Sequence, residues 1–392
     1  MIIIVLTVLI FLLYLISESI LLNRRIKKIP LRISVTGTRG KSTVTRLLAS
    51  VLEENGKRVI AKTTGSEPCI ILPDRKEMKI KRRGMVSIME QLKFIKKAAA
   101  VKAECIVTEI MSLQPENHYV ESQQIFKPNI VIITNVRRDH TEAMGGSVEE
   151  IAEVFCLDIT DNAKVFLHEN EYREVFQKAA DQKGSVVNKV QDGISSEILK
   201  MNPDLKIDEF QENLDIVYSA GKFLNISDEQ ILNGIRKAKH DIGKLKIWKF
   251  KSEQGEKSNY FVNCFAANDP ESTFQAVSGV QKILEQESLK KIGLLNLRED
   301  TGDRTLQWID ALKGAQNIFN KVYVIGRHAN ILKRKVNNKN TEVLKISSPQ
   351  TITEKLLREN EDKSAIFGIG NMAGIGKILV EFWDKTGDDY RI

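Results

Sequence analysis

A short glycine-containing turn, placed between an expected strand and an expected helix, constrains this chain more than any other feature. Residues 32–36 read as a strand, and residues 37–43 have the sequence Gly-Thr-Arg-Gly-Lys-Ser-Thr. The helix expected next has an apolar face with the spacing of an element that packs on a sheet, formed by Val44, Leu47, Leu48, Val51 and Leu52. This order of strand, turn and helix predicts a phosphate-binding loop.

The residue types in the turn suit a nucleotide phosphate. Glycines let the backbone turn tightly, so that successive N–H groups and the helix N-terminus point at phosphate oxygens. Lys41 adds a positive charge, and Ser42 offers a hydroxyl for Mg²⁺. The common P-loop pattern has a glycine where this chain has Val35, so the loop has the shorter form G-x-x-G-K-S-T. The residues expected at the phosphates are Gly37, Thr38, Arg39, Gly40, Lys41, Ser42 and Thr43.

Strands and helices are expected to alternate after this loop. Residues 58–63, 105–110 and 129–134 read as strands, and residues 86–102 read as a helix. Such alternation is typical of a mostly parallel sheet with helices on both faces. Ligand groups then belong at the carboxyl ends of the strands.

Polar side chains stand at those carboxyl ends. Glu109 ends one strand, Asn135 follows the next, and Asp139 and His140 lie in the loop after it. A carboxylate and an imidazole beside a triphosphate are suited to holding Mg²⁺. Taken alone, Glu109 could be a surface acid and His140 a helix cap. Their joint appearance after successive strands favours a metal site.

The first 22 residues predict a transmembrane anchor. Residues 1–16 carry no charge, the apolar run resumes at residues 20–22, and a basic block fills residues 24–28. This length suits a bilayer core of roughly 30 Å. A cleaved signal peptide would have basic residues before the apolar run, and a buried amphipathic helix would have a polar face. The positive-inside rule places Met1 outside and residues after 23 in the cytoplasm, with residues 23–32 as a basic linker.

Composition limits the classes of function. The chain of 392 residues is 42% hydrophobic and 28% charged, which suits two domains plus the anchor. Part of the net charge of +8 lies in residues 24–28 and 79–83, and no aromatic RNA-reading motif accompanies it, so nucleic acid is excluded as a partner. The four cysteines have no zinc spacing and read as buried, reduced thiols.

A second alternating domain is expected toward the carboxy terminus. Residues 291–297, 321–325 and 365–369 read as strands, and the glycines of residues 368–374 read as a tight turn from strand to helix. A charged loop could hold an amino-acid substrate or could be a solvated loop, and its residues are Arg298, Asp300, Asp303 and Arg304.

The segments TGTRGKST, TEIMS and ITNVRRDH resemble the central domain of Mur ligases and folylpolyglutamate synthases. The resemblance implies an ATP-dependent amide ligase. It makes Lys41 and Ser42 contacts of phosphate and metal, and Glu109 and His140 further metal ligands. Lys41, Glu109 and His140 become the catalytic residues, and the expected cofactors are ATP and Mg²⁺, with Mn²⁺ as an alternative.

Further segments extend the resemblance. Residues 213–225 are similar to the family helix whose first asparagine reads adenine, which makes Asn213 the candidate. Asn135 and Lys244 are further nucleotide contacts, although the family usually has arginine at the position of Lys244. Asn263 and Asn268 lie in a segment similar to the opening of the ligase domain and would face the nucleotide.

The resemblance also implies the fold class and its division. The fold is α/β, with a Mur-ligase-like P-loop domain at residues 33–250 that has a parallel-rich sheet. A smaller Rossmann-like ligase domain is expected at residues 251–392. Many Mur ligases carry a carbamylated lysine some fifteen residues beyond the Asp-His pair, and residues 153–161 contain no lysine. Asp158 or Glu153 supplying that carboxylate directly is a hypothesis.

The anchor narrows the family. No UDP-binding domain fits between the anchor and the loop, and folylpolyglutamate synthases are soluble. The combination resembles the catalytic subunits of poly-γ-glutamate synthase. This implies polymerisation of glutamate through a γ-glutamyl phosphate, with release of ADP and phosphate. The implied partners are glutamate, the growing polymer and small membrane subunits, and a homo-oligomer is an open alternative.

Other functions remain as alternatives. A folylpolyglutamate or peptidoglycan-precursor ligase would share the reaction but take a different acceptor. A membrane-bound P-loop transport ATPase would hydrolyse ATP without consuming glutamate, and its metal-binding strand would end in aspartate rather than Glu109. A scaffold for a membrane complex would leave the phosphate and metal residues unexplained.

Overall fold

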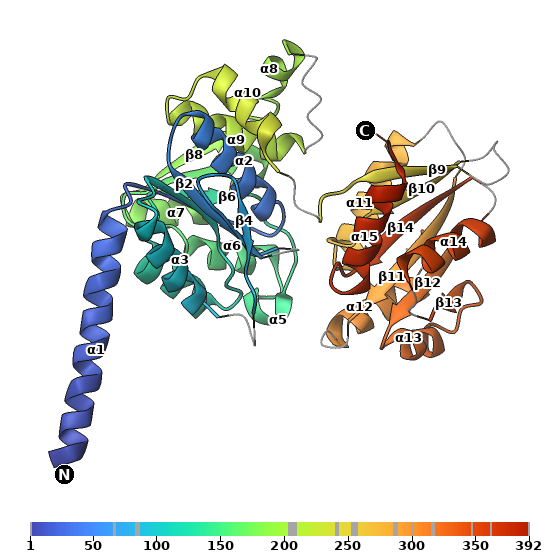
Figure 1. The fold of residues 1–392 in the computed structure, drawn as a ribbon, viewed down its shortest axis with the longest axis horizontal. Helices are drawn as coiled ribbons and strands as arrows, with labels where there is room; N and C mark the ends of the chain where they lie inside the picture. The colour runs from blue at the N-terminus through green and yellow to red at the C-terminus, as the bar shows by residue number, and fades with distance from the viewer. Residues whose placement is uncertain are drawn as a thin grey trace. The chain divides into compact units, whose positions relative to one another are not determined.

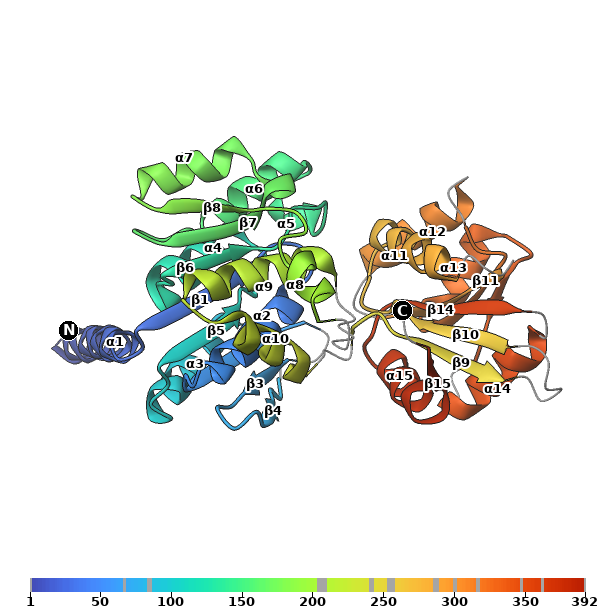
Figure 2. The same cartoon turned by 90° about the horizontal axis from the view of Figure 1, so that it is seen from above.

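The chain forms two compact units in a computed structural model, Met1–His240 and Asp241–Ile392. The structure describes residues 2–65, 68–82, 87–202, 210–239, 243–251, 258–284, 289–298, 302–314, 318–345, 348–360 and 363–390. Each unit has a sheet with helices on both faces, as Figures 1 and 2 show from two directions. The α/β fold class expected from the sequence is confirmed.

The sheet of the first unit is mostly parallel. Among the described strands seven share one direction, and β3, which lies between β2 and the edge strand β4, runs opposite to them. In spatial order the strands are β4 (Glu77–Lys79), β3 (Cys69–Ile71), β2 (Val59–Thr63), β5 (Cys105–Glu109), β1 (Leu31–Thr36), β6 (Ile130–Ile133), β7 (Lys164–His168) and β8 (Val186–Val190). The strands expected at 32–36, 58–63, 105–110 and 129–134 are therefore present, with ends shifted by one residue.

Alternating side chains divide the core of this unit into two faces. Val35, Ala61 and Val107 point to the face covered by α2 (Lys41–Glu54), α9 (Gln211–Phe223) and α10 (Asp228–Lys237). Neighbours such as Ile106 and Ile133 point to the other face, which is covered by α3 (Met89–Ala100), the π-helix η1 (Val120–Phe126), α6 (Val148–Cys156) and α7 (Glu174–Gln182). Short helices fill the connections, namely α4 (Pro115–Tyr119), α5 (Thr141–Met144), η2 (Glu169–Glu171) and α8 (Ser196–Lys200).

The amino-terminal helix α1 (Ile2–Lys27) meets the unit only at its carboxy-terminal end (Figure 1). It is the one helix in the described ranges that is long and apolar enough to cross a membrane. The basic linker expected at residues 23–32 is not a separate segment, because the helix continues to Lys27 and β1 begins at Leu31. The apolar residues within the basic stretch explain the difference, since Ile26 and Ile29 are buried in the core beneath α3.

The second unit also has a mostly parallel sheet. Its strands in spatial order are β13 (Thr341–Val343), β12 (Lys321–Gly326), β11 (Lys290–Leu297), β14 (Ser364–Gly370), β10 (Ser258–Asn263), β9 (Ile247–Lys251) and β15 (Asp388–Tyr390). One face packs on α11 (Pro270–Ile283), α12 (Gly302–Lys313) and α13 (Ala329–Val336), and the other packs on α14 (Pro349–Glu359) and α15 (Ile375–Thr386). The strands expected near 291, 321 and 365 are present.

Two expected boundaries differ from the structure. A division between residues 250 and 251 falls inside β9, which pairs with β10 and so belongs to the second sheet. The pairing of β9 with β10 depends on residues outside β9, so the sequence of residues 247–251 alone does not predict it. The helix expected from residue 86 begins at Met89, and residue 86 lies outside the described residues.

Gly234 is required where α10 crosses α2. A Cβ at this position would lie 2.5 Å from the Cα of Val51, so the two helix backbones could not keep their distance. We expect Gly234→Ala to lower the free energy of unfolding by about 1–3 kcal/mol, measured by urea unfolding followed by circular dichroism. Gly279→Ala in α11 is the control, because a Cβ there meets nothing within 4 Å. An unchanged unfolding midpoint for Gly234→Ala would contradict the close helix approach.

Candidate functional site

Strand pairing brings the predicted site residues of the first unit to one edge of its sheet. Strand β1 pairs with both β5 and β6, and its residue Val35 is opposite Glu109. Because these strands are parallel, the glycine loop, Glu109 and the loop after β6 emerge side by side. The convergence expected from the sequence is therefore present in the fold.

The glycine loop has a backbone that only glycine adopts without strain. Gly37 has φ 121° and Gly40 has φ 83°. A Cβ at Gly37 would lie 2.2 Å from Thr134 Oγ1. Asn135 holds the loop from the side, since its Oδ1 accepts from Arg39 N at 2.9 Å and its backbone oxygen accepts from Thr38 N at 3.0 Å. Asn135 is thus a support of the loop.

Lys41 begins α2 and folds back over the loop. Its Nζ donates to the backbone oxygens of Gly37 at 2.5 Å and Thr38 at 3.1 Å. Burial lowers the pKa of Lys41 below its ordinary value of 10.5, and the charge of Glu109 opposes this effect. An anionic ligand in the loop would therefore replace weak carbonyl contacts of this ammonium group with a stronger partner.

The Ser42 hydroxyl and the Glu109 carboxylate are neighbouring oxygen groups of the kind that bind a metal ion. Ser42 Oγ donates to Glu109 Oε2 at 2.7 Å, and the other oxygen of Glu109 accepts from Thr64 N. Glu109 is only 1% exposed. The loop after β2 also closes on this pair, because a Cβ at Gly65 would lie 2.4 Å from Ser42 Oγ. A buried carboxylate and a hydroxyl this close fit a hard divalent cation.

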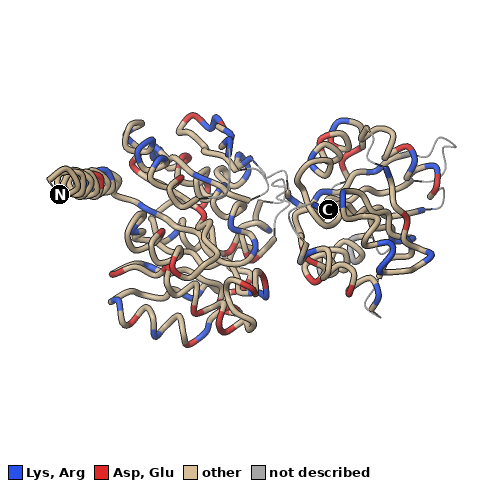
Figure 3. The backbone as a smooth tube through the Cα atoms, turned by 90° about the horizontal axis from the view of Figure 1, so that it is seen from below, with Lys and Arg blue, Asp and Glu red and all other residues tan. Residues whose placement is uncertain are grey.

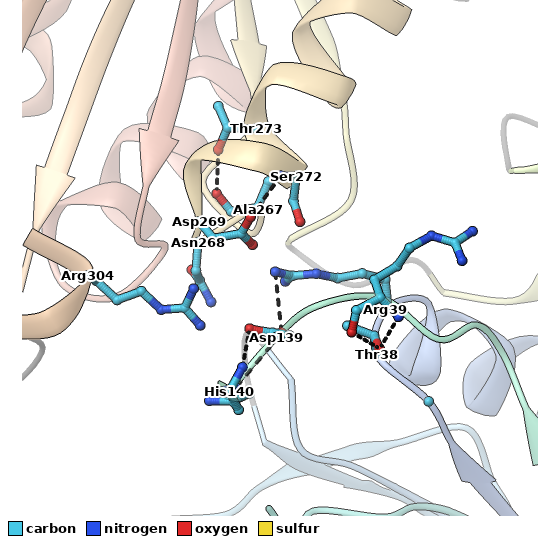
Figure 4. Close-up of polar contacts among 12 residues, drawn as sticks. Thr38, Arg39, Asp139, His140, Ala267, Asn268, Asp269, Ser272, Thr273 and Arg304 are labelled. Atoms are coloured by element: carbon cyan, nitrogen blue, oxygen red, sulfur yellow. Dashed lines mark hydrogen bonds and ion pairs between the residues drawn. The ribbon is translucent and has the colours of Figure 1, made fainter. Parts of the chain in front are cut away.

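His140 lies in the loop after β6, beside a contact that joins this loop to the glycine loop. Its Nε2 is 3.9 Å from Asp139 Oδ2, and its Nδ1 is 3.6 Å from Glu142 Oε1. Arg39 Nη2 lies 3.5 Å from Asp139 Oδ2, as Figure 4 shows. His140 has a left-handed backbone with φ 48° and begins α5. The ring is half-exposed, so it remains open to a ligand.

Asn213, the adenine candidate, lies against the glycine loop. It is 7% exposed, and a Cβ at Gly40 would lie 2.7 Å from its Oδ1. Two residues further along α9, the buried Asp215 accepts hydrogen bonds from Gly193 N at 2.9 Å and Ser195 N at 2.8 Å. Asp215 therefore fixes the position of α9 beside the loop, a role that sequence reasoning missed.

Asp215 also belongs to a cluster with His168 and Asp192 that has the composition of a metal site. His168 Nε2 lies 3.4 Å from Asp192 and 3.9 Å from Asp215. However, His168 Nδ1 accepts from Asn170 N at 3.4 Å, which leaves the proton of the neutral ring on Nε2. Among the described residues Nε2 has no hydrogen-bond partner, although it faces both carboxylates, and the three side chains close the end of β7.

A second buried histidine, His118, was not singled out from the sequence. Its Nδ1 lies 2.9 and 3.1 Å from the two oxygens of Asp158, which also accepts from Ser122 Oγ at 2.7 Å. Among the described residues, His118 Nε2 has no hydrogen-bond partner. Burial alone would lower the pKa of His118, but the charge and hydrogen bond of Asp158 outweigh it, so the pKa lies above 6.5. Lys41 is near enough to oppose this rise.

The segment after Glu109 is held by a buried carboxylate of the π-helix. Glu121 accepts from Ser112 Oγ at 2.5 Å, from Ser112 N at 3.2 Å and from Gln91 Nε2. Burial raises the pKa of Glu121, and these hydrogen bonds oppose the rise. Because π-helical turns are rare and often occur at functional sites, the insertion that turns Glu121 and Ser122 inward supports the site assignment.

In the second unit, Asn263 and Lys244 are joined. Asn263 Nδ2 donates to Lys244 O at 2.9 Å, and its Oδ1 accepts from Phe265 N at 3.3 Å. Asn263 is 1% exposed, so its amide organises the turn after β10. The nucleotide contact expected of Asn263 from the sequence stays a prediction.

Asn268 lies at the start of α11, in the turn that Asn263 supports. With its amide nitrogen toward the sheet, Asn268 lies 3.1 Å from Gly370 O and 3.2 Å from Phe265 O. The adjacent Asp269 caps α11 by accepting from Ser272 N at 2.8 Å, and Figure 4 labels these residues. Asn268 is half-buried at the surface of this turn.

Two further features expected in the second unit from the sequence are the glycine turn and the charged loop. Of the glycine segment 368–374, residues 368–370 end β14 and residues 371–374 form the turn to α15, where Asn296 Nδ2 donates to Asn371 O at 2.6 Å. Arg298 follows β11, and Arg304 lies in α12. Asp300 and the side chain of Asp303 lie outside the described residues, so the substrate loop expected there is not tested.

Two protein-family models match the chain. The Mur ligase middle domain matches residues 35–232, and the poly-gamma-glutamate synthase CapB C-terminal domain matches residues 249–386. The PGA synthase CapB of Bacillus subtilis (strain 168) is 30% identical over 369 residues, which cover 92% of this chain and 91% of that protein. The capsule biosynthesis protein CapB of Bacillus anthracis is 32% identical over 73% of this chain and 61% of that protein.

Solved structures share the fold at low sequence identity. E. coli FolC in complex with DHPP and ADP has a TM-score of 0.63 and 13% identity, and covers 94% of this chain and 92% of that one. The folylpolyglutamate synthase of Yersinia pestis with AMPPNP and Mn has a TM-score of 0.65, 13% identity and the same coverage. MurF from Acinetobacter baumannii has a TM-score of 0.62 and 12% identity, and covers 93% of this chain and 80% of that one. With two family models and a relative matched over nine-tenths of both chains, this chain belongs to the CapB family of poly-γ-glutamate synthases, whose central part is a Mur ligase domain.

Proposed function

We propose that this chain is an ATP-dependent amide ligase that polymerises glutamate into poly-γ-glutamate, as a capsule or secreted polymer. Membership of the CapB family supports the reaction and its substrate. The observation that carries the proposal is the convergence of Lys41 with the Ser42–Glu109 pair at one edge of the sheet. This arrangement suits a metal-bound triphosphate.

The reaction needs an activated carboxylate, because a carboxylate is a poor electrophile. An oxygen of the glutamate γ-carboxylate attacks the γ-phosphorus of ATP, and the bond from that phosphorus to the β–γ bridging oxygen breaks, which releases ADP. The α-amine of the next glutamate then attacks the acyl carbon, loses a proton and displaces phosphate. Lys41 and the backbone amides at the start of α2 neutralise the charge that develops on the phosphoryl oxygens.

The donor set fits a divalent cation. Ser42 and Glu109 supply oxygens that Mg²⁺ prefers, and His140 adds a nitrogen that Mn²⁺ also accepts. The relative from Yersinia pestis was solved with Mn and AMPPNP. When bound, the cation would supply positive charge at the phosphates. Catalysis would then depend on Lys41, Glu109 and His140 together.

The nucleotide base and the second unit supply the other proposed contacts. Asn213 is the proposed adenine contact, since it lies beside Gly40 at the loop. In the second unit, Lys244 is the proposed phosphate contact, a point charge that lacks the bidentate geometry of arginine. Asn268 is the proposed amide at the nucleotide, and Asn263 supports the turn that carries it.

Asp158, which the sequence offers as the carboxylate for a second cation, is engaged by a histidine and a serine. Both of its oxygens face His118, and one also accepts from Ser122. Glu153 is exposed on α6. We infer that the His118–Asp158 pair occupies the part of the site where related ligases have a carbamylated lysine, and that it supplies local charge rather than a metal ligand.

The chain is proposed to work at the cell membrane. Helix α1 would be a single-pass anchor with the catalytic units in the cytoplasm, which suits its length and the basic residues at its end. Small membrane subunits that hold or export the polymer are the proposed partners. A homo-oligomer remains an alternative assembly.

Two alternatives make different products. A folylpolyglutamate or peptidoglycan-precursor ligase would share the fold, which relatives at 12–13% identity show, but would use another acceptor. A transport ATPase would release phosphate from ATP without glutamate. A panel of acceptors, with ADP counted against amide formed, separates these from the proposed function.

The first test removes the loop ammonium. We expect Lys41→Ala to lower ligation at least about a hundredfold, because the transferring phosphoryl loses its closest protein cation. The measurement is labelled glutamate incorporated by membranes that contain the chain and its partners. Lys57→Ala is the matched control, since Lys57 is exposed at the opposite edge. Normal polymer formation by Lys41→Ala would show that the site is misassigned.

The second test traps the intermediate. Hydroxylamine added with ATP and glutamate should give γ-glutamyl hydroxamate and ADP, because it attacks the acyl carbon in place of the amine. Colorimetric detection of the hydroxamate and separation of the nucleotides provide the readout. Release of AMP and pyrophosphate would instead indicate an acyl-adenylate.

The third test concerns His118. Its pKa is raised above 6.5 in the folded chain, so its pairing with Asp158 stabilises the fold fully below pH 6.5 and less as the pH rises through the raised pKa. We therefore expect His118→Gln to lower the free energy of unfolding more at pH 6 than at pH 9, measured by urea unfolding at both pH values. Asp158→Asn should remove the same pH dependence, and a pH-independent loss in both variants would contradict the charged pair.

A further inference from the structure

We propose that the amino-terminal edge of the first sheet is a contact surface for anionic lipid headgroups. The inference rests on α1 as a membrane anchor and goes beyond the ligase reaction. It concerns the loops that precede the parallel strands, on the side of the unit where α1 enters. The basic residues of these loops are called the basic edge, and they are Lys57, Arg58, Lys102, Lys127, Lys164 and Lys183.

No spacer separates the anchor from the body of the first unit. Residues 2–16 of α1 are exposed, whereas Leu22 packs against the same core that buries Ile26 and Ile29. Lys127 Nζ donates to Asn23 Oδ1 at 2.9 Å, and this hydrogen bond holds the last turns of α1 against the first unit. The apolar end of the anchor and the core of the unit therefore overlap within two helical turns.

The length of α1 determines where the basic edge lies relative to the bilayer. A helix of 26 residues spans roughly 39 Å, which exceeds the roughly 30 Å hydrocarbon core of a bilayer. Its last turns therefore reach the headgroup layer, where its basic residues Arg24, Arg25 and Lys27 lie. Since Ile26 and Ile29 are buried in the unit, the adjoining edge of the unit reaches the same layer.

Strand direction places the basic edge at this level. Strand β1 runs from α1 toward the glycine loop, and β2, β5, β6, β7 and β8 run in the same direction. All of these strands therefore begin on the side where α1 enters. Lys57 and Arg58 precede β2, and Lys102 precedes β5, and all three are exposed. Lys and Arg positions are blue in Figure 3, where several lie along this end of the first unit.

Acidic residues also lie on the basic edge, where Asp161 is exposed and several others are engaged. Glu104 accepts from Arg58 N at 3.0 Å, and Asp181 accepts from Gln177 Nε2 at 2.8 Å. Glu54, at the end of α2, pairs with Arg75 and with Lys237 at 2.8 Å. The opposite edge has the cations Arg39 and Lys41 of the glycine loop as well as Arg137 and Arg138. It also has many exposed acids, namely Glu116, Glu142, Glu149, Glu169 and Asp192. The charge of the unit is thus asymmetric along the strands.

Anionic lipid is the occupant that this geometry favours. A polybasic surface held against a bilayer attracts acidic headgroups, and the attraction acts within about one Debye length. The growing polyanionic polymer is another candidate ligand in chemical terms, but it forms at the opposite edge, roughly 20 Å away along the six residues of β1. The surface therefore keeps the carboxyl edge turned toward the cytoplasm.

The test uses the full chain in lipid nanodiscs, with and without phosphatidylglycerol in phosphatidylcholine. The four native cysteines are buried, so a surface cysteine can be labelled selectively with a fluorophore. Asp161→Cys reports on the basic edge, and Glu149→Cys is the matched reporter on the opposite edge. With a nitroxide quencher on the lipid headgroups, we expect strong quenching at residue 161, increased by phosphatidylglycerol, and little at residue 149.

Charge-matched variants separate lipid contact from simple proximity. Lys57→Gln combined with Lys102→Gln should remove most of the increase caused by phosphatidylglycerol, and lower the contact population by roughly tenfold. Lys189→Gln combined with Lys200→Gln changes the charge equally away from the edge and should retain this increase. ATP turnover should stay normal in both variants, because none of these residues is part of the nucleotide site.

Three outcomes would overturn the inference. Equal quenching in both lipid mixtures would mean that the edge does not bind acidic headgroups. Loss of quenching on addition of poly-γ-glutamate at constant ionic strength would identify the polymer as the ligand. Loss of the chain from the discs would contradict the anchor itself, while leaving the ligase reaction to be judged by ATP turnover and hydroxamate formation.

Discussion

The pairing of β1 with β5 on one side and β6 on the other is the constraint on which the rest of the structure depends. It joins segments that are about 70 and 100 residues apart in the chain, by the register of Val35 with Glu109 and of Thr36 with Ile133. Because the three strands are parallel, the glycine loop, the carboxylate and the loop of His140 share one edge. A shift of one residue in β5 would turn Glu109 to the other face of the sheet and separate it from Ser42.

Buried polar groups then fix each part of this edge. Asn135 holds the glycine loop, Glu121 holds the segment after Glu109, and Asp215 holds the helix that carries Asn213. Each acts mainly by accepting hydrogen bonds from backbone amides, so the site depends on carboxylates and amides that have no direct role in the chemistry. Such supports limit the movement of the residues that contact the nucleotide.

Local sequence patterns predicted much of this arrangement. The apolar spacing from Val44 to Leu52 identified α2, and the position of Glu109 after an apolar run identified the end of β5, because both are short-range properties. The pairing of His118 with Asp158 could not be predicted, since it joins residues 40 positions apart and depends on a proton position. The burial of Asn263 was also missed, because its partner is a backbone oxygen. The continuation of α1 to Lys27 was hidden by a basic stretch that also contains Ile26 and Ile29.

The direct connection from α1 to β1 has a consequence for the proposed encounters with membrane subunits. Only residues 28–30 separate the helix from the strand, and Ile29 among them is fully buried. With α1 in a bilayer, as proposed, the first unit would lose most of its freedom to tumble, and its diffusion would be confined to two dimensions. A partner subunit in the same bilayer would therefore meet a small range of orientations, which reduces the rotational entropy lost when the two proteins associate.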